Sequence, residues 1–170
     1  MKFSHHLVLC TAACLLACAT AAVKNEALNA LCQVVGIIDG DTFTARCPNQ
    51  QVRVRFASID APESGQAYSR VSRQYLSMLI FRKRVWVVQS KAEHSYNRIV
   101  ANVYDERGQD VVLLMVRAGL AWHYKHFAHE QTPAARTAYA LAEDAARQQK
   151  LGLWIDPQAQ APWDWRHQTK

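Results

Sequence analysis

Residues 34–56 alternate between hydrophobic and polar side chains, as expected for strands that bury one face. The alternation predicts strands at 34–38, 42–46 and 52–56. In the third strand Val54 and Phe56 lie on the apolar face, so Arg53 and Arg55 point away from it. Pro62 then prevents the strand pattern from continuing.

From residue 66 to 81 the apolar positions recur at helical spacing: Val71, Tyr75, Leu76, Leu79 and Ile80. Two further strands are expected at 84–89 and 98–104. Asp110 is a good N-cap for a helix that runs through Ala118 and ends at Gly119. Thr132 and Pro133 start a last helix that reaches about residue 150. Periodicity alone therefore predicts a mixed α+β fold.

The first 22 residues have the features of a secretory signal peptide. Lys2 is their one charged residue, the apolar run 7–17 is too short to span a bilayer, and Ala19-Thr20-Ala21 suits a cleavage site. We expect a single domain over 23–170, with its core at about 32–154 and a tail at 155–170, in a secreted or periplasmic protein. The alternatives are a lipid anchor at Cys18, which follows Leu15-Leu16-Ala17, or a buried core helix.

Outside the predicted leader the chain has two cysteines, Cys32 and Cys47. Asp39-Gly40 predicts a two-residue hairpin turn with positive φ angles. Counting back from this turn places Cys32 opposite Cys47, within reach of a disulfide, with a bulge expected between them. Two free buried thiols are the alternative.

The chain has a formal net charge of +6. Removal of the leader takes away only Lys2, so the remainder keeps a positive excess. This balance favours a polyanionic partner through long-range attraction, but on charge alone a merely soluble basic protein is the better explanation.

Three carboxylates and two arginines are the candidate chemical groups: Asp41, Asp60, Glu63, Arg55 and Arg98. Carboxylates hold hard cations and activate water, whereas arginines bind phosphate oxygens. Asp41 starts the second strand and Asp60 is expected to end the third, so the two could share a Ca²⁺ or Mg²⁺ ion. Each motif alone has a simpler interpretation, because aspartates at turns usually cap backbone groups and strand arginines usually face solvent.

The order and spacing of these pieces resemble the staphylococcal nuclease family from about residue 34 to 154. The resemblance rests on Asp39-Gly40-Asp41-Thr42, on the segment 55–63 and on Tyr96-Asn97-Arg98. It implies a five-stranded OB-fold barrel with three helices. It also implies a monomeric nuclease that hydrolyses DNA and RNA with little sequence preference and leaves 3′-phosphates.

The resemblance also implies roles for individual residues. Asp41, Asp60 and the carbonyl of Ala61 would bind Ca²⁺, with Mg²⁺ or Mn²⁺ as other possible cations. Glu63 would be the general base, and Arg55 and Arg98 would bind the scissile phosphate. Asp39 and Thr42 would support the metal ligands. Tyr96 and Tyr124 could stack on bases or contact flanking phosphates, with packing in the core as the alternative for both. The chain departs from the family pattern at Ala61, where many relatives have threonine, and at Asn97, where glycine is common.

Two other functions fit the same fold, a catalytically silent nucleic-acid-binding module and an envelope lipoprotein. The presence of all five charged residues favours the enzyme over the silent module. His123, His126 and His129 precede Glu130 in an order that matches no zinc-protease motif. Near the end of the chain Trp154, Trp163 and Trp165 are expected to pin the tail to the barrel, with stacking on nucleic acid as the alternative.

Overall fold

The computed structural model describes residues 28–90 and 98–168. The predicted leader, Cys18 and Tyr96 lie outside the described residues. Within the described part of the chain no helix is both long and apolar enough to cross a membrane.

Five strands close into a barrel in the order β1-β2-β3-β6-β5, which confirms the predicted architecture. All neighbours are antiparallel except β3 and β6, which run parallel with Arg55 opposite Val100. A separate pair of two-residue strands, β4 and β7, places Asp60 opposite Trp122. The strands are β1 (Asn29–Ile37), β2 (Thr42–Arg46), β3 (Gln51–Phe56), β4 (Ile59–Asp60), β5 (Arg84–Gln89), β6 (Ile99–Asp105) and β7 (Trp122–His123).

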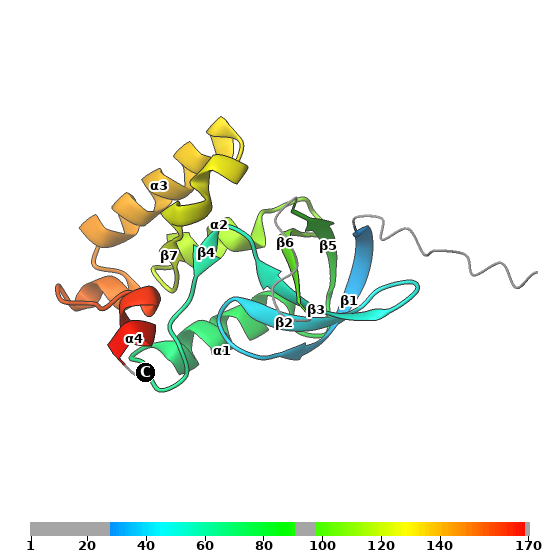
Figure 1. Cartoon of the computed structure of the whole chain (residues 1–170), viewed down its shortest axis with the longest axis horizontal. Helices are drawn as coiled ribbons and strands as arrows, with labels where there is room; N and C mark the ends of the chain where they lie inside the picture. Colours follow the sequence, from blue (N-terminus) through cyan, green and yellow to red (C-terminus); the bar gives the residue numbers. More distant parts are fainter. Residues whose placement is uncertain (1–27, 91–97, 169–170) are drawn as a thin grey trace, which may run out of the picture.

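The helices lie mainly outside the barrel (Figure 1). The α-helices are α1 (Ser69–Ile80), α2 (Val111–Arg117), α3 (Pro133–Gln148) and α4 (Pro162–Gln168), and the 3₁₀ helices are η1 (Lys125–Glu130) and η2 (Gly152–Ile155). Asp110 and Thr132 cap α2 and α3 as predicted, because each side chain accepts a main-chain N–H of the first turn. In Figure 1 the barrel strands occupy one end of the molecule, and α3 and α4 occupy the other.

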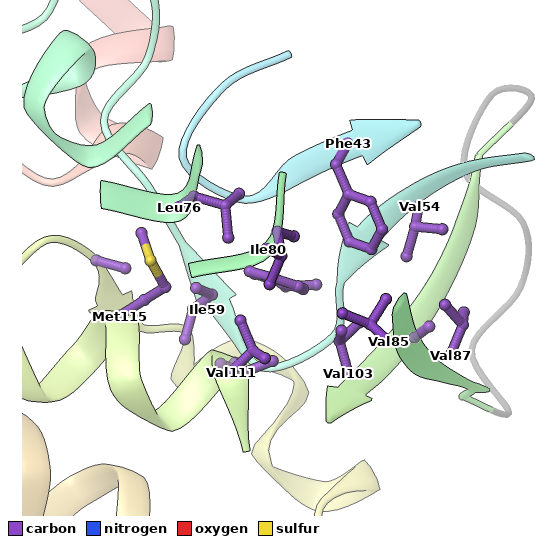
Figure 2. Packing of buried hydrophobic residues seen from close by; sticks show 14 of the residues in the cluster. Phe43, Val54, Ile59, Leu76, Ile80, Val85, Val87, Val103, Val111 and Met115 are labelled. Atoms are coloured by element: carbon purple, nitrogen blue, oxygen red, sulfur yellow. The ribbon is translucent and has the colours of Figure 1, made fainter. Parts of the chain in front are cut away.

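The core fills the barrel and continues beneath α1 and α2 (Figure 2). Phe43 from β2 and Phe56 from β3 pack with ring centroids 5.8 Å apart. Leu76 and Ile80 of α1 close this core and are 0% exposed. Val71 is an exception to the predicted helix face, since it is 46% exposed, and Ser72 takes the buried position by donating a hydrogen bond to the carbonyl of Leu120.

The predicted two-residue turn at Asp39-Gly40 is wrong. The loop is longer, because Ile37 pairs with Phe43 and the N–H of Ile38 donates to the carbonyl of Thr42. Gly40 does not need a positive φ. It is required because a Cβ atom there would lie 2.0 Å from the hydroxyl oxygen of Ser72.

A bulge between Val34 and Gly36 restores the register that the sequence predicted. Beyond this bulge Cys32 and Cys47 are joined by a disulfide with a Cα–Cα distance of 4.3 Å. An extra residue in one strand shifts its pairing by one position, which here offsets the longer turn.

Two further expectations need correction. Asp60 does not end the third strand, because β3 ends at Phe56 and the chain bends before β4. The bend is held by the N–H of Ala57, which donates to the carbonyl of Ala101, and by the carbonyl of Ser58, which accepts the N–H of Tyr124. The tail also contains a fourth α-helix, α4, where no regular structure was predicted.

Candidate active site

Five of the predicted site residues line a pocket of about 580 Å³ at the edge of the barrel. Its walls come from the loop before β2, from β3, from β4 and the segment after it, from the start of β6, from the residue after β7, from η1 and from α4. Predicted site residues in the lining are Asp39, Arg55, Glu63, Arg98 and Tyr124.

Arg55 connects the two buried aspartates of the site. Its Nη1 lies 2.9 Å from Oδ1 of Asp41, and its Nη2 lies 2.7 Å from Oδ1 of Asp60. The two aspartates are 2% and 0% exposed, respectively. The register explains the first contact, because Arg55 pairs with Thr42, the residue after Asp41. The contact with Asp60 depends on β4, which brings this aspartate back toward the barrel.

The Asp41 carboxylate accepts hydrogen bonds from several sides. The hydroxyl of Thr42 donates to Oδ1 at 2.8 Å, and the main-chain N–H of Ala61 donates to Oδ2 at 2.9 Å. Asp39 caps the loop by accepting the N–H of Asp41. The predicted supporting residues therefore lie where they hold Asp41 in place. A buried carboxylate with this many donors is well fixed in orientation.

Negative charge dominates the inner part of this site. Burial raises the pKa of the Asp41 carboxyl, and the Arg55 guanidinium opposes that shift. Burial alone would lower the pKa of Arg55, but Asp41 and Asp60 raise it above its ordinary value, so this arginine stays charged. One guanidinium is thus shared between two buried carboxylates, and a second positive charge beside them would be stabilising.

That second charge comes from Arg166 of α4. Its Nη2 lies 2.8 Å from Oδ2 of Asp60, and its Nη1 contacts Oε1 of Glu63. The pKa of Arg166 is raised, chiefly by its hydrogen bond to Asp60. No sequence motif indicated this residue. Pro162 at the start of α4 is a helix-start signal, but it does not indicate where the helix packs.

Aromatic side chains form the outer wall of the pocket. Tyr124 packs against Phe127 and Trp163 with ring centroids 5.5 and 5.4 Å apart. Tyr124 and Phe127 also line the pocket itself. The other predicted substrate contact, Tyr96, falls in the segment 91–97, outside the described residues.

Comparison with known proteins identifies the family. The family model described as "Staphylococcal nuclease homologue" matches residues 53–156. The chain belongs to the staphylococcal nuclease family. It is 42% identical over 146 residues to a protein of Shigella flexneri named "Micrococcal nuclease", covering 81% of each chain. It is 39% identical over 140 residues to an "Uncharacterized endonuclease" of Haemophilus influenzae, covering 82% of this chain and 74% of the relative.

Membership of the staphylococcal nuclease family supports a nuclease function for this chain. It also confirms the resemblance on which the sequence-based roles depend. The matched region ends before α4, so Arg166 lies beyond the part of the chain that the family model covers.

The three histidines near η1 have separate surroundings. His123 is buried, with Nε2 at 3.0 Å from Oε1 of Gln131, and burial lowers its pKa. His126 packs edge-on against Phe127 at the surface. Across residues 28–90 and 98–168, no three histidine, cysteine or acidic side chains are grouped as a metal site.

The tryptophans also differ from one another in position. Trp154 packs against Trp122 at 5.1 Å, and the Arg147 guanidinium lies over its ring. Trp163 does not pin the tail to the barrel strands as predicted. It contacts Tyr124 and so brings α4 to the pocket. The sequence alone could not indicate this partner, since the two residues are far apart along the chain.

Proposed function

We propose that this protein is an exported, metal-dependent nuclease that hydrolyses phosphodiester bonds of DNA and RNA. The observation that carries the proposal is the pairing of Arg55 with two buried aspartates at a pocket that Glu63 and Arg98 also line. The catalytically silent alternative lacks support, because all five charged residues of the proposed site are present. Three of them, Arg55, Glu63 and Arg98, line the same pocket.

Glu63 would accept a proton from a water molecule as that water attacks the phosphorus atom. The bond from phosphorus to the 5′ oxygen would break and the released oxygen would take up a proton from water, which leaves a 3′-phosphate on one product and a 5′-hydroxyl on the other. Arg55 and Arg98 would bind the phosphate oxygens and stabilise the extra negative charge of the transition state. The contribution of both arginines is therefore mainly electrostatic.

The residues at the inner end of the site suit a hard divalent cation. Asp41 and Asp60 offer carboxylate oxygens that one guanidinium can reach together, and Ala61 adds a main-chain oxygen close by in the chain. Burial is the main cause of the raised pKa of Asp41, and the neighbouring charges of Asp39 and Asp60 add to it. Oxygen donors prefer Ca²⁺, Mg²⁺ or Mn²⁺ over softer metals, and Ca²⁺ is the cation we propose. When bound, the cation would act as a Lewis acid toward the phosphate.

Weak sequence preference follows from the kinds of groups at the pocket. Arginines contact phosphates, which are the same for every base. Tyr124 and Phe127 offer ring faces, and any base can stack on a ring face. Either nucleic acid could therefore be a substrate, provided that the strand is open enough to enter the pocket.

The decisive experiment compares Glu63→Gln with the wild type on single-stranded DNA, with Ca²⁺ and with a chelator. The substitution keeps size and removes the charge, so we expect turnover to fall by roughly two to four orders of magnitude while the fold is kept. Chelator should abolish the wild-type activity. Glu106→Gln is the matched control, because Glu106 pairs with Arg84 at the surface and away from the pocket.

Lysine substitutions test the arginines in the same assay. Arg55→Lys and Arg98→Lys should both be strongly impaired, because an ammonium group cannot reproduce two-point contact with phosphate. Arg107→Lys, on an exposed turn, is the control. Activity that survives the chelator and all three site substitutions would place the chemistry elsewhere.

Export is supported by the Cys32–Cys47 disulfide, because disulfides persist mainly in oxidising compartments. Together with the features of residues 1–22, it leads us to propose cleavage near Ala21 or Ala22 and a secreted or periplasmic location. Mass spectrometry of the mature protein tests this directly. A mature chain that retains Met1 would contradict it, and a lipid on Cys18 would favour the anchored form.

A further inference from the structure

The C-terminal helix α4 supplies a side chain that touches two proposed active-site residues at once. Arg166 donates to both carboxylate oxygens of Asp60, at 3.3 Å from Nη1 and 2.8 Å from Nη2, and its Nη1 also donates to Oε1 of Glu63. The guanidinium therefore bridges a buried carboxylate and the proposed general base. Its side chain is 39% exposed, so it lies at the mouth of the site.

The segment leading into α4 is attached to the loop that carries Glu63. Gln66 accepts the main-chain N–H of Glu63 at 2.9 Å and donates to the carbonyl of Gln160 at 2.6 Å. Gln66 is 7% exposed, so both hydrogen bonds are largely shielded from water. The main chain of Glu63 and its carboxylate are thus both tied to the C-terminal segment.

The position of α4 is set independently by packing. Ala161 and Pro162 are buried, and Trp163 contacts the ring of Tyr124 at the edge of the pocket. In Figure 1, α4 lies beside the chain that descends from β4 to α1, which is the segment that contains Glu63. Arg166 therefore approaches the site from an element with its own contacts.

Glu63 needs such support more than the aspartates do. Its side chain is 36% exposed and lies in irregular structure between β4 and α1, whereas Asp41 and Asp60 are buried. A catalytic group must be held within roughly 0.5 Å of its productive position, and loops hold side chains less precisely than strands or helices do. A displacement of about 1 Å can cost a factor of roughly 100 in rate.

We propose that Arg166 is a positioning residue of this active site, which holds the Glu63 carboxylate against Asp60 so that the base faces the pocket. The inference rests on the proposed role of Glu63. It adds to the functional unit the C-terminal helix, which lies beyond residues 53–156, the region matched by the family model.

A double-mutant cycle tests this proposal in single-turnover and steady-state assays on labelled single-stranded DNA. Arg166→Gln should lower kcat by about 10- to 100-fold, the scale of a misplaced catalytic group, and change KM by less than about threefold. Adding Arg166→Gln to Glu63→Gln should cause no further loss, because residues that act through one another are not additive.

Two further variants distinguish a positioning role of Arg166 from a folding defect. Arg166→Lys keeps a positive charge beside Asp60 but cannot hold both carboxylates, so its turnover should lie between those of Arg166→Gln and the wild type. His167→Gln changes the next, exposed residue of α4 and should behave like the wild type. Circular dichroism and thermal melting establish that each variant is folded.

The possible contrary results are distinct. If Arg166→Gln keeps normal turnover while Glu63→Gln is inactive, the positioning role is wrong and the proposed function stands. If the two losses multiply, Arg166 acts on the substrate directly, and if turnover rises, Arg166 obstructs the site. Both of these outcomes overturn the proposal. Full activity in both single variants would instead overturn the proposed function itself.

Discussion

The barrel and the C-terminal segment both contribute charged side chains to the candidate active site, but they are held by very different amounts of buried surface. Arg55 extends from a strand whose neighbours Val54 and Phe56 are 0% and 1% exposed within a closed sheet. Arg166 extends from a seven-residue helix in which Pro162 is the one buried residue. A helix this short has little stability of its own and depends on its contacts.

Because of this difference, the two regions contribute to the site in different ways. The barrel sets the distance between Asp41 and Arg55 through strand register, which cannot change without disrupting the sheet. The C-terminal segment adds contacts to Glu63 that can be removed while the barrel stays intact. We therefore expect changes in the buried core of the barrel to act mainly on stability, and changes in α4 to act mainly on turnover.

The largest effect on stability should come from the barrel core. Phe43→Ala removes a side chain that is 0% exposed and packed against Phe56, so we expect a loss of about 3–5 kcal/mol in the free energy of unfolding. Urea denaturation measures this loss. Met78→Ala, at a position that is 70% exposed, is the control and should change stability by less than about 0.5 kcal/mol. A similar loss in the free energy of unfolding for both variants would mean that Phe43 is not part of a tightly packed core.

Removal of the disulfide should have the next largest effect. The Cys32–Cys47 bridge spans a sequence separation of 15, for which the chain-entropy model gives a contribution of about 3 kcal/mol. Replacing both cysteines with alanine should therefore lower the melting temperature but keep turnover at temperatures where the protein is folded. An unchanged melting temperature would show that the barrel already restricts this loop without the bridge.

The smallest effect on stability should come from deletion of residues 161–170. Among the described residues of this segment, Ala161 and Pro162 are the buried ones and Trp163 adds its contact with Tyr124, so we expect a loss of about 1–2 kcal/mol. Turnover should nevertheless fall at least as far as in Arg166→Gln, since the same contact to Glu63 is lost. A loss above about 4 kcal/mol in the free energy of unfolding would show that the segment is part of the core, and the contrast with the barrel would not hold.

Much of the barrel and several parts of the site could be predicted from the sequence. Alternation placed Phe43, Val54 and Phe56 inside and Arg55 outside, because the period of a strand determines which face a side chain takes. The caps at Asp110 and Thr132 followed from local hydrogen bonding. These features depend on residues that are close together along the chain, so they can be predicted from the sequence.

Other features were decided only by the tertiary structure. Local sequence patterns do not indicate the parallel pairing of β3 with β6 or the bend that separates Asp60 from β3. They also do not indicate the contact of Trp163 with Tyr124. Gly40 illustrates the same limit, because its small size is required by Ser72 on α1 rather than by a turn angle. Arg166 is the clearest case. An arginine in the last turn of a helix is common, and only the packing of α4 places its charge between Asp60 and Glu63.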